Sequence, residues 1–425
     1  MTRHPTDADE SEEKEDGRGV GKSAAVFLPA CRTFCNLLPP FTVYTAVAAC
    51  GPTRGQAPAQ KTGGRALQAF IHIGTEKTGT TSIQAMLQAN RANLLGQGVA
   101  YLKSPGLRSH RELAAYCMRA DRFDDFFKAN FITTAEERAA YRAKFLKRFL
   151  SELAHLPPAV HTVLASSEHF HSRLLHQDEM ETLRQLFAPL CERITVITYL
   201  RPQVDTAISD YSTALKCGHV ASLHDFVHSR CVPDNPYYNY QEYLQKWAGV
   251  FGRENLRVRL FDRAEFVNGD LLQDFLAQLT PGLAEFVNTG LAPQNRSLDQ
   301  LGQCLLKAVN RHLPQFIEGL GFNELNMDLV RLISVRAAGP SPQLEQELRK
   351  AVQARFAAGN EQVRREYFPQ RPRLFAQDAA TEELPVRRPA LDPAQEALLG
   401  EVINLLAQAL KRQVRENMRS DMALG

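Results

Sequence analysis

The chain has 425 residues, of which 44% are hydrophobic and 23% are charged. These proportions are those of ordinary globular proteins, so a wholly disordered or fibrous chain is excluded. The 50 Lys and Arg residues exceed the 47 Asp and Glu residues by only three, which is too small an excess for a dedicated nucleic-acid-binding protein.

The eight cysteines are spread along the chain without a CxxC pair. Structural zinc sites and small disulfide-stabilised domains both depend on closely spaced cysteines. The pair His169 and His171 has no third ligand at a usual metal-binding spacing. We therefore expect neither a disulfide framework nor a metal requirement.

The N-terminal segment differs from the rest of the chain in its charge. Residues 1–17 hold seven acidic and two basic residues, whereas residues 18–65 hold six basic residues and no acidic one. Such blocks are typical of a tail, and we expect residues 1–65 to be disordered and to carry no catalysis. The apolar stretch 24–50 is interrupted by polar residues and a Pro-Pro pair, whereas a membrane span needs about 20 predominantly apolar residues. We expect a cytoplasmic protein without stable membrane insertion, the alternative being a membrane anchor through residues 24–50.

From residue 66 onward, short apolar runs alternate with amphipathic segments, which is typical of an α/β fold with a parallel sheet flanked by helices. The predicted strands are 67–73, 159–166, 194–200 and 256–261, and the predicted helices between them are 82–95, 136–153, 204–216 and 238–251. After residue 270 helical patterns dominate, including a late helix from Pro393 to about Arg415. We expect an α/β domain over residues 66–320 and a helical C-terminal part over residues 321–425 packed on the same domain.

The first predicted strand runs directly into a glycine- and threonine-rich loop that precedes a helix. Such a loop lets successive backbone N–H groups point at an anion, and the helix N-terminus adds its dipole. Gly74 and Gly79 have the spacing of the GxxxxGK[ST] phosphate-binding loop, but Thr80 stands where the lysine belongs, and the lysine is inside the loop as Lys77. This departure disfavours an ATPase or GTPase. The alternative is a strand-to-helix turn that binds nothing.

The third predicted strand ends at Arg201-Pro202 and is followed by a predicted helix that carries Ser209. Ligands of open α/β sheets bind at the carboxyl ends of the strands, so the Arg201 guanidinium and the Ser209 hydroxyl are candidates for holding a second anion. The alternative is an arginine paired with a carboxylate and a serine that contacts a helix neighbour.

Together, the two motifs resemble those of the sulfotransferases that use 3′-phosphoadenosine 5′-phosphosulfate (PAPS), bacterial members included. In that family a KxGTT loop after the first strand holds the 5′-phosphosulfate. An Arg at the end of a later strand and a Ser eight residues further on hold the 3′-phosphate, and their matches are Arg201 and Ser209. The loop residues expected to bind the donor are Lys77, Thr78, Gly79, Thr80, Thr81 and Ser82.

The resemblance implies a P-loop-like fold and PAPS as donor co-substrate, and it extends in layout over residues 67–300. One element departs from the family pattern. The glycine-rich RKG element that covers the adenosine and the 3′-phosphate in cytosolic members has no evident match. Arg296 is a candidate substitute for it.

Sulfuryl transfer resembles phosphoryl transfer, in which catalysis is positioning plus electrostatic stabilisation. Lys77 is the expected stabilising cation. The acceptor also needs a general base, which is commonly a His or a Glu. The candidates are Glu168, which we favour, then His169, and then His110 from the segment after the first helix; the alternative for Glu168 is a structural cap or ion pair.

These observations predict an enzyme that moves the sulfuryl group from PAPS to a hydroxyl or amine of a small-molecule or glycan acceptor. The rival functions are a P-loop small-molecule kinase and a catalytically inert nucleotide-binding protein of the same fold. Acceptor contacts are expected in the segment 101–135, and the tyrosines at 237, 238 and 240 either line an acceptor pocket or pack in the core. The late helix either joins the core or forms a homodimer face.

Overall fold

The structure is a computed structural model, and it describes residues 67–290, 297–317, 321–376 and 393–424. The predicted tail, the apolar stretch 24–50 and Arg296 lie outside these ranges. Within them, no helix combines the length and the apolar character needed to cross a membrane.

A five-stranded parallel sheet forms the centre of the described part, in the order β2-β3-β1-β4-β5. This confirms the predicted α/β class. The strands are β1 (Leu67–Ile73), β2 (Val99–Tyr101), β3 (Thr162–Ser167), β4 (Cys191–Leu200) and β5 (Leu256–Leu260). Four of them were predicted, whereas β2 was missed because three residues at a sheet edge are too few to show a periodic pattern.

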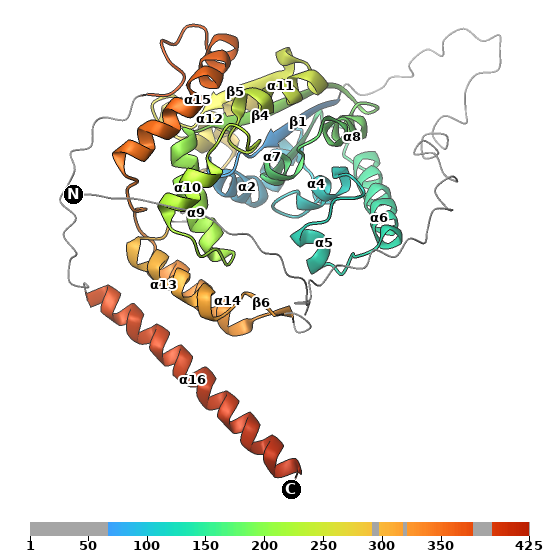
Figure 1. Cartoon of the computed structure of the whole chain (residues 1–425). Coiled ribbons are helices and arrows are strands. Elements are labelled where there is room, and N and C mark those ends of the chain that lie inside the picture. Colours follow the sequence, from blue (N-terminus) through green and yellow to red (C-terminus); the bar gives the residue numbers. More distant parts are fainter. Residues whose placement is uncertain (1–66, 291–296, 318–320, 377–392, 425) are drawn as a thin grey trace, which may run out of the picture. The chain divides into compact units, whose positions relative to one another are not determined.

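Helices cover both faces of this sheet (Figure 1). On one face, Ala69, Ile71 and Ile73 of β1 pack in a core with α4, α6, α8 and α11. On the other face, Phe70 packs with α2, α3 and α12. The two faces of β1 alternate because successive side chains of a strand point in opposite directions.

The helices that pack on the sheet and connect its strands have the following bounds: α2 (Thr80–Ala89), α3 (Arg91–Gly96), α4 (Arg111–Cys117), α5 (Asp125–Ala129), α6 (Ala135–Ala154), α7 (His169–Arg173), α8 (Gln177–Phe187), α9 (Gln203–Lys216), α10 (Leu223–Arg230), α11 (Tyr240–Phe251) and α12 (Leu271–Leu279). The predicted helices 136–153, 204–216 and 238–251 are thereby confirmed within two residues at each end. The prediction of one helix over 82–95 is wrong, because the helix is interrupted at Asn90 and forms two separate helices, α2 and α3. The Asn90 side chain donates to the Met86 and Asn288 carbonyls and accepts from the Asn288 N–H, which ties the break to a distant segment.

The C-terminal elements are α13 (Gln300–His312), the antiparallel pair β6 (Phe316–Ile317) and β7 (Gly321–Phe322), α14 (Glu324–Arg336), α15 (Gln346–Tyr367) and α16 (Pro393–Leu424). A second apolar cluster joins α9 and α10 to α13, α14, α15 and α16. The predicted late helix therefore exists as α16, and its Leu398 and Val402 are buried in this cluster. The same cluster holds α15 against α9.

A buried carboxylate fixes α12 to the sheet. Asp274 is fully buried and accepts hydrogen bonds from the Tyr199 hydroxyl at 2.7 Å, from Arg259 Nη2 at 2.5 Å and from the Val267 N–H at 3.2 Å. A buried charge is tolerated when it is paired and hydrogen-bonded in this way, and removing one partner strands the others.

We expect Asp274→Ala to lower the free energy of unfolding by about 3 kcal/mol, because Tyr199 and Arg259 lose their shared acceptor. Urea denaturation of the full chain measures this loss. Asp328→Ala is the matched control, since Asp328 belongs to an exposed ion pair with Arg331 on α14, and it should change stability by less than about 0.5 kcal/mol. Equal effects of the two substitutions would contradict the proposed role of Asp274.

Candidate functional site

The loop between β1 and α2 has a constrained backbone. Lys77 has φ 70° and Gly79 has φ 76°, both in the left-handed region. That conformation costs a non-glycine residue such as Lys77 about 1 kcal/mol or more. At Gly79 a side chain is excluded for a second reason, because an added Cβ would overlap the Leu271 side chain of α12.

The first residue of α2 has an unsatisfied hydroxyl. Thr80 is buried, and its Oγ1 has no hydrogen-bond partner among the described residues. Gly74 makes room for it, since a Cβ at residue 74 would overlap the Thr80 side chain. The first turn of α2 carries no acidic residue. A buried hydroxyl without a partner at the N-terminus of a helix is a suitable partner for an anion.

Lys77 points its ammonium toward α9. Its Nζ donates to Thr213 Oγ1 at 2.5 Å. Burial lowers the pKa of Lys77, while the carboxylates of Asp210 and Glu76 oppose that change. A cation held in a partly dry site acts more strongly on nearby charge than one in water.

Arg201 connects the two predicted motifs. It follows the last residue of β4, and its Nη1 donates to the Lys77 carbonyl at 3.2 Å. Its own carbonyl accepts from the Tyr240 hydroxyl at 2.7 Å, and its guanidinium lies 5.8 Å from the ring centre of Phe261. Burial lowers the pKa of Arg201, although an arginine keeps its charge under all ordinary conditions.

The loop and Arg201 open into one cavity of about 1090 Å³. Its volume lies slightly above the usual range of about 300 to 1,000 Å³ for small-molecule and cofactor sites. The predicted residues that line it are Lys77, Gly79, Thr80, Thr81, Ser82, Glu168, Arg201 and Ser209. The sheet register explains the convergence, because Ile73 of β1 lies opposite both Ser167 of β3 and Thr198 of β4.

Thr78 is the exception within the predicted loop. It is fully buried, and its Oγ1 and its N–H both donate to the Thr75 carbonyl, at 2.6 and 3.3 Å. It does not line the cavity. The side chain of Thr78 therefore shapes the loop, and its contact with the ligand stays a prediction.

Glu168 lies directly after β3, at the edge of the cavity. Its Oε2 accepts from Gln84 Nε2 at 2.7 Å and from Ser109 Oγ at 3.2 Å. Both donors are neutral, and the carboxylate is 29% exposed. Glu168 is thus oriented by its neighbours while it still faces the cavity.

His169 stands beside Glu168 but does not line the cavity. Its Nε2 lies 3.9 Å from Glu168 Oε1, and its Nδ1 is buried without a hydrogen-bond partner among the described residues. Burial lowers the pKa of His169, the nearby Glu168 raises it, and Arg111 and Arg173 lower it further. The imidazole is therefore biased toward its neutral form.

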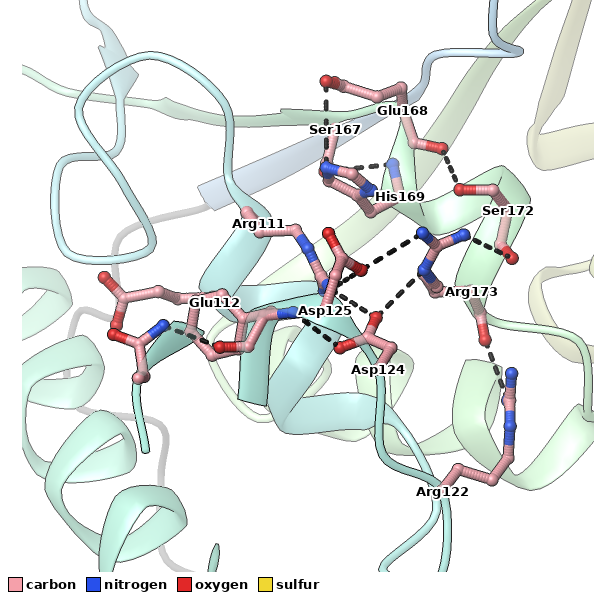
Figure 2. A network of polar contacts seen from close by, with 12 residues as sticks. Arg111, Glu112, Arg122, Asp124, Asp125, Ser167, Glu168, His169, Ser172 and Arg173 are labelled. Carbon is pink, nitrogen blue, oxygen red and sulfur yellow. Dashed lines mark hydrogen bonds and ion pairs between the residues drawn. The ribbon is translucent and has the colours of Figure 1, made fainter. Parts of the chain in front are cut away.

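An ion-pair network from α4, α5 and α7 supports this pair (Figure 2). Arg173 Nε lies 2.9 Å from Asp124, which also pairs with Arg111. Asp125 lies 3.3 Å from Arg173 and 3.5 Å from Arg111. The sequence signal for it was only the Arg- and Asp-rich character of residues 101–135, because the pairs join residues far apart in the chain.

His110 lies after the first helix, as expected, at the start of α4. It is fully buried; its Nε2 donates to the Leu102 carbonyl at 2.9 Å, and its Nδ1 accepts from the Ser166 N–H at 3.1 Å. Burial lowers its pKa to about 3. Both ring nitrogens are thus hydrogen-bonded to the backbone, at Leu102 after β2 and at Ser166 in β3, which gives His110 a structural role. Its role as a base stays a prediction.

Two carboxylates near Lys77 were not singled out in the sequence. Glu76 accepts from the Tyr237 hydroxyl at 3.1 Å, and Asp210 accepts from the Tyr238 hydroxyl at 3.3 Å. Burial, with the nearby Glu76, raises the pKa of Asp210 to about 6. Each is the sequence neighbour of a predicted site residue: Glu76 directly precedes Lys77, and Asp210 directly follows Ser209.

The fold and site together define an α/β protein with a glycine- and threonine-rich loop at the carboxyl edge of a parallel sheet, beside a large cavity. No known protein family matches the sequence, and no curated protein is similar to it. Among solved structures, the chain is similar to a sulfotransferase from Alicyclobacillus acidocaldarius, with a TM-score of 0.37 and 15% sequence identity, over 70% of this chain and 94% of the other. A likeness of this size carries no argument about function. Within the described ranges, no group of three or more His, Cys, Asp or Glu side chains is placed to hold a metal ion.

The raised pKa of Asp210 makes stability depend on pH. The pKa of Asp210 is about 6 in the folded protein and ordinarily 3.8. The bound proton therefore contributes fully to stability below the ordinary pKa, and this contribution is lost as the pH rises through the pKa of the folded protein. The Asn side chain of Asp210→Asn stays neutral at all these pH values. The free energy of unfolding of this variant, relative to the unmodified protein, should therefore increase as the pH rises from about 4.5 to about 7.5. Urea denaturation at both pH values measures the change, and a pH-independent difference would contradict it.

Proposed function

We propose that the protein is a sulfotransferase that moves the sulfuryl group from PAPS to a hydroxyl or amine of an acceptor. The observation that carries the proposal is the opening of two anion-binding motifs into one cavity of about 1090 Å³. PAPS is a nucleotide with anionic groups at both its 5′ and its 3′ side. A single-phosphate ligand would leave one of the two motifs without a partner.

The chain's residues fit the donor at both ends. On the 5′ side, the Thr80 hydroxyl is buried and has no hydrogen-bond partner among the described residues, and it lies at the N-terminus of α2, where the helix dipole favours an anion. On the 3′ side, Arg201 and Ser209 line the cavity. The Lys77 carbonyl accepts a hydrogen bond from Arg201, which fixes the positions of the two motifs relative to each other.

In the proposed reaction, the S–O bond between the sulfuryl group and the 5′-phosphate breaks as a bond from the acceptor to sulfur forms. Adenosine 3′,5′-bisphosphate leaves with the bonding electron pair, and the acceptor proton passes to a base. Lys77 stabilises the negative charge that develops on the leaving oxygen, as preorganised cations do in phosphoryl transfer. Glu168 is the proposed base, because it lies at the cavity, whereas His169 lies behind it.

The first test of the proposal is ligand-induced stabilisation. Adenosine 3′,5′-bisphosphate should raise the melting temperature by several degrees at about 100 times its Kd, and ATP with Mg²⁺ should raise it much less. The physical reason is that the loop lacks the lysine that contacts the β- and γ-phosphates. Thermal denaturation with each ligand measures the difference.

Arg201→Ala should lose most of this stabilisation, while Arg331→Ala, an exposed arginine of α14, should keep it. Stabilisation by ATP with Mg²⁺ but not by the bisphosphate would favour a kinase and refute the proposal. Stabilisation by the bisphosphate without transfer from labelled PAPS to any member of a panel of sugars, amines and alcohols would favour an inert binder.

Glu168→Gln should reduce kcat by about 10² to 10⁴ if Glu168 is the general base, with no change in the affinity for the bisphosphate. Lys77→Ala should reduce kcat at least as strongly, because it removes the cation at the leaving group. Transfer from labelled PAPS to the best acceptor measures kcat, and titration with the bisphosphate measures its affinity, so a loss of turnover is distinguished from a loss of binding. Turnover close to that of the unmodified enzyme in Glu168→Gln would remove Glu168 from the role and leave His169.

A further inference from the structure

A second, smaller cavity of about 300 Å³ adjoins the first. Four residues line both cavities: Arg201, Asp205, Ser209 and Ser297. The second cavity is also lined by the segment from Ser341 to Gln343 and by Arg349 of α15. The 3′ side of the main cavity is therefore continuous with a pocket built from the C-terminal part of the chain.

This pocket carries a net positive charge. Its charged lining residues are Arg201, Arg349 and Asp205, which sum to one excess positive charge. Arg349 Nη1 donates to Asp205 Oδ1 at 2.9 Å. The pKa of Arg201 is lowered mainly by burial, and Arg349 is close enough to lower it further while Asp205 raises it. Arg349 is paired with Asp205, and the Arg201 guanidinium is close enough to feel the charges of both. The two guanidinium groups repel each other, and a bound anion relieves that repulsion.

The position of Arg349 is fixed by the packing of α15 on α9 (Figure 1). Leu348 and Val352 of α15 are buried in the cluster shared with α9. Further along, Gln203 Nε2 donates to Asn360 Oδ1 at 2.7 Å, and Asn360 Nδ2 donates back to Gln203 Oε1 at 3.1 Å. These contacts hold the first turn of α15, and with it Arg349, beside the start of α9.

The opposite wall of the pocket is also fixed. The Gly339 N–H donates to the Ser297 carbonyl at 2.8 Å, and the Leu298 N–H donates to Ser212 Oγ of α9 at 3.4 Å. Ser297 is thereby held between α9 and the segment that precedes α15. Its side chain joins that of Ser209 in lining the pocket.

We propose that Arg349 is a second cationic arm for the 3′-phosphate of the donor, opposite Arg201, so that α15 supplies a determinant of nucleotide specificity. The inference rests on the proposed function, because it takes PAPS as the donor. Asp205 acts as a positioning residue that orients the Arg349 guanidinium. Arginine suits this role because its planar fork matches the geometry of a phosphate.

The test compares two nucleotides that differ only in the 3′-phosphate, adenosine 3′,5′-bisphosphate and adenosine 5′-monophosphate. Arg349→Ala should weaken binding of the bisphosphate by at least about tenfold and leave binding of the monophosphate within about twofold. Arg349→Lys should fall between Ala and the unmodified protein, since it keeps the charge but not the fork. Isothermal titration of the full chain measures both ligands.

Arg365→Ala is the matched control, because Arg365 lies on the same helix, is 73% exposed and lines neither cavity. It should bind both nucleotides as the unmodified protein does. An unchanged preference for the bisphosphate in Arg349→Ala would overturn the inference and leave the proposed function standing. Failure of the unmodified protein to bind the bisphosphate would overturn both. Should Arg349→Ala not fold, Arg349→Lys decides: an unchanged preference there contradicts the role, and a reduced one supports it.

Discussion

The hydrogen bond from Arg201 to the Lys77 carbonyl links the two halves of the site. It exists because β1 and β4 are adjacent parallel strands whose carboxyl ends meet at one edge of the sheet. The same edge receives β3, and so brings Glu168 to the loop. The positions of the loop, Arg201 and the candidate base Glu168 thus follow from one sheet order. The helices next to these strand ends complete the arrangement. The Leu271 side chain of α12, for example, packs against Gly79 and leaves no space for a side chain there.

The features that could be predicted from sequence are those whose signal is local. Each predicted strand is a run of buried apolar residues, and the residues after it must lie at the same edge as those after its neighbours. This reasoning brought Lys77, Glu168, Arg201 and Ser209 to one cavity, as the structure has them. The strand β2 escaped because it has three residues.

The errors and omissions concern contacts made across the chain. His110 could be recognised as buried only once β2 and β3 supplied its partners, the Leu102 carbonyl and the Ser166 N–H. Asn90 breaks a helix through a contact with Asn288, which no helical periodicity reveals. The network of Arg111, Asp124 and Arg173 likewise joins three elements. Charged residues carry little information about their partners until the fold places them together.

The backbone conformation of Lys77 is unfavourable for a residue with a long side chain. A left-handed backbone at φ 70° favours glycine, or after it asparagine, over a long-chain residue. The residue that would suit the turn best therefore lacks the ammonium group. Where a chain keeps a lysine in such a conformation, the loop gives up free energy of folding to hold a positive charge in one place. Selection for stability alone would thus replace Lys77 and remove the ammonium group from this loop.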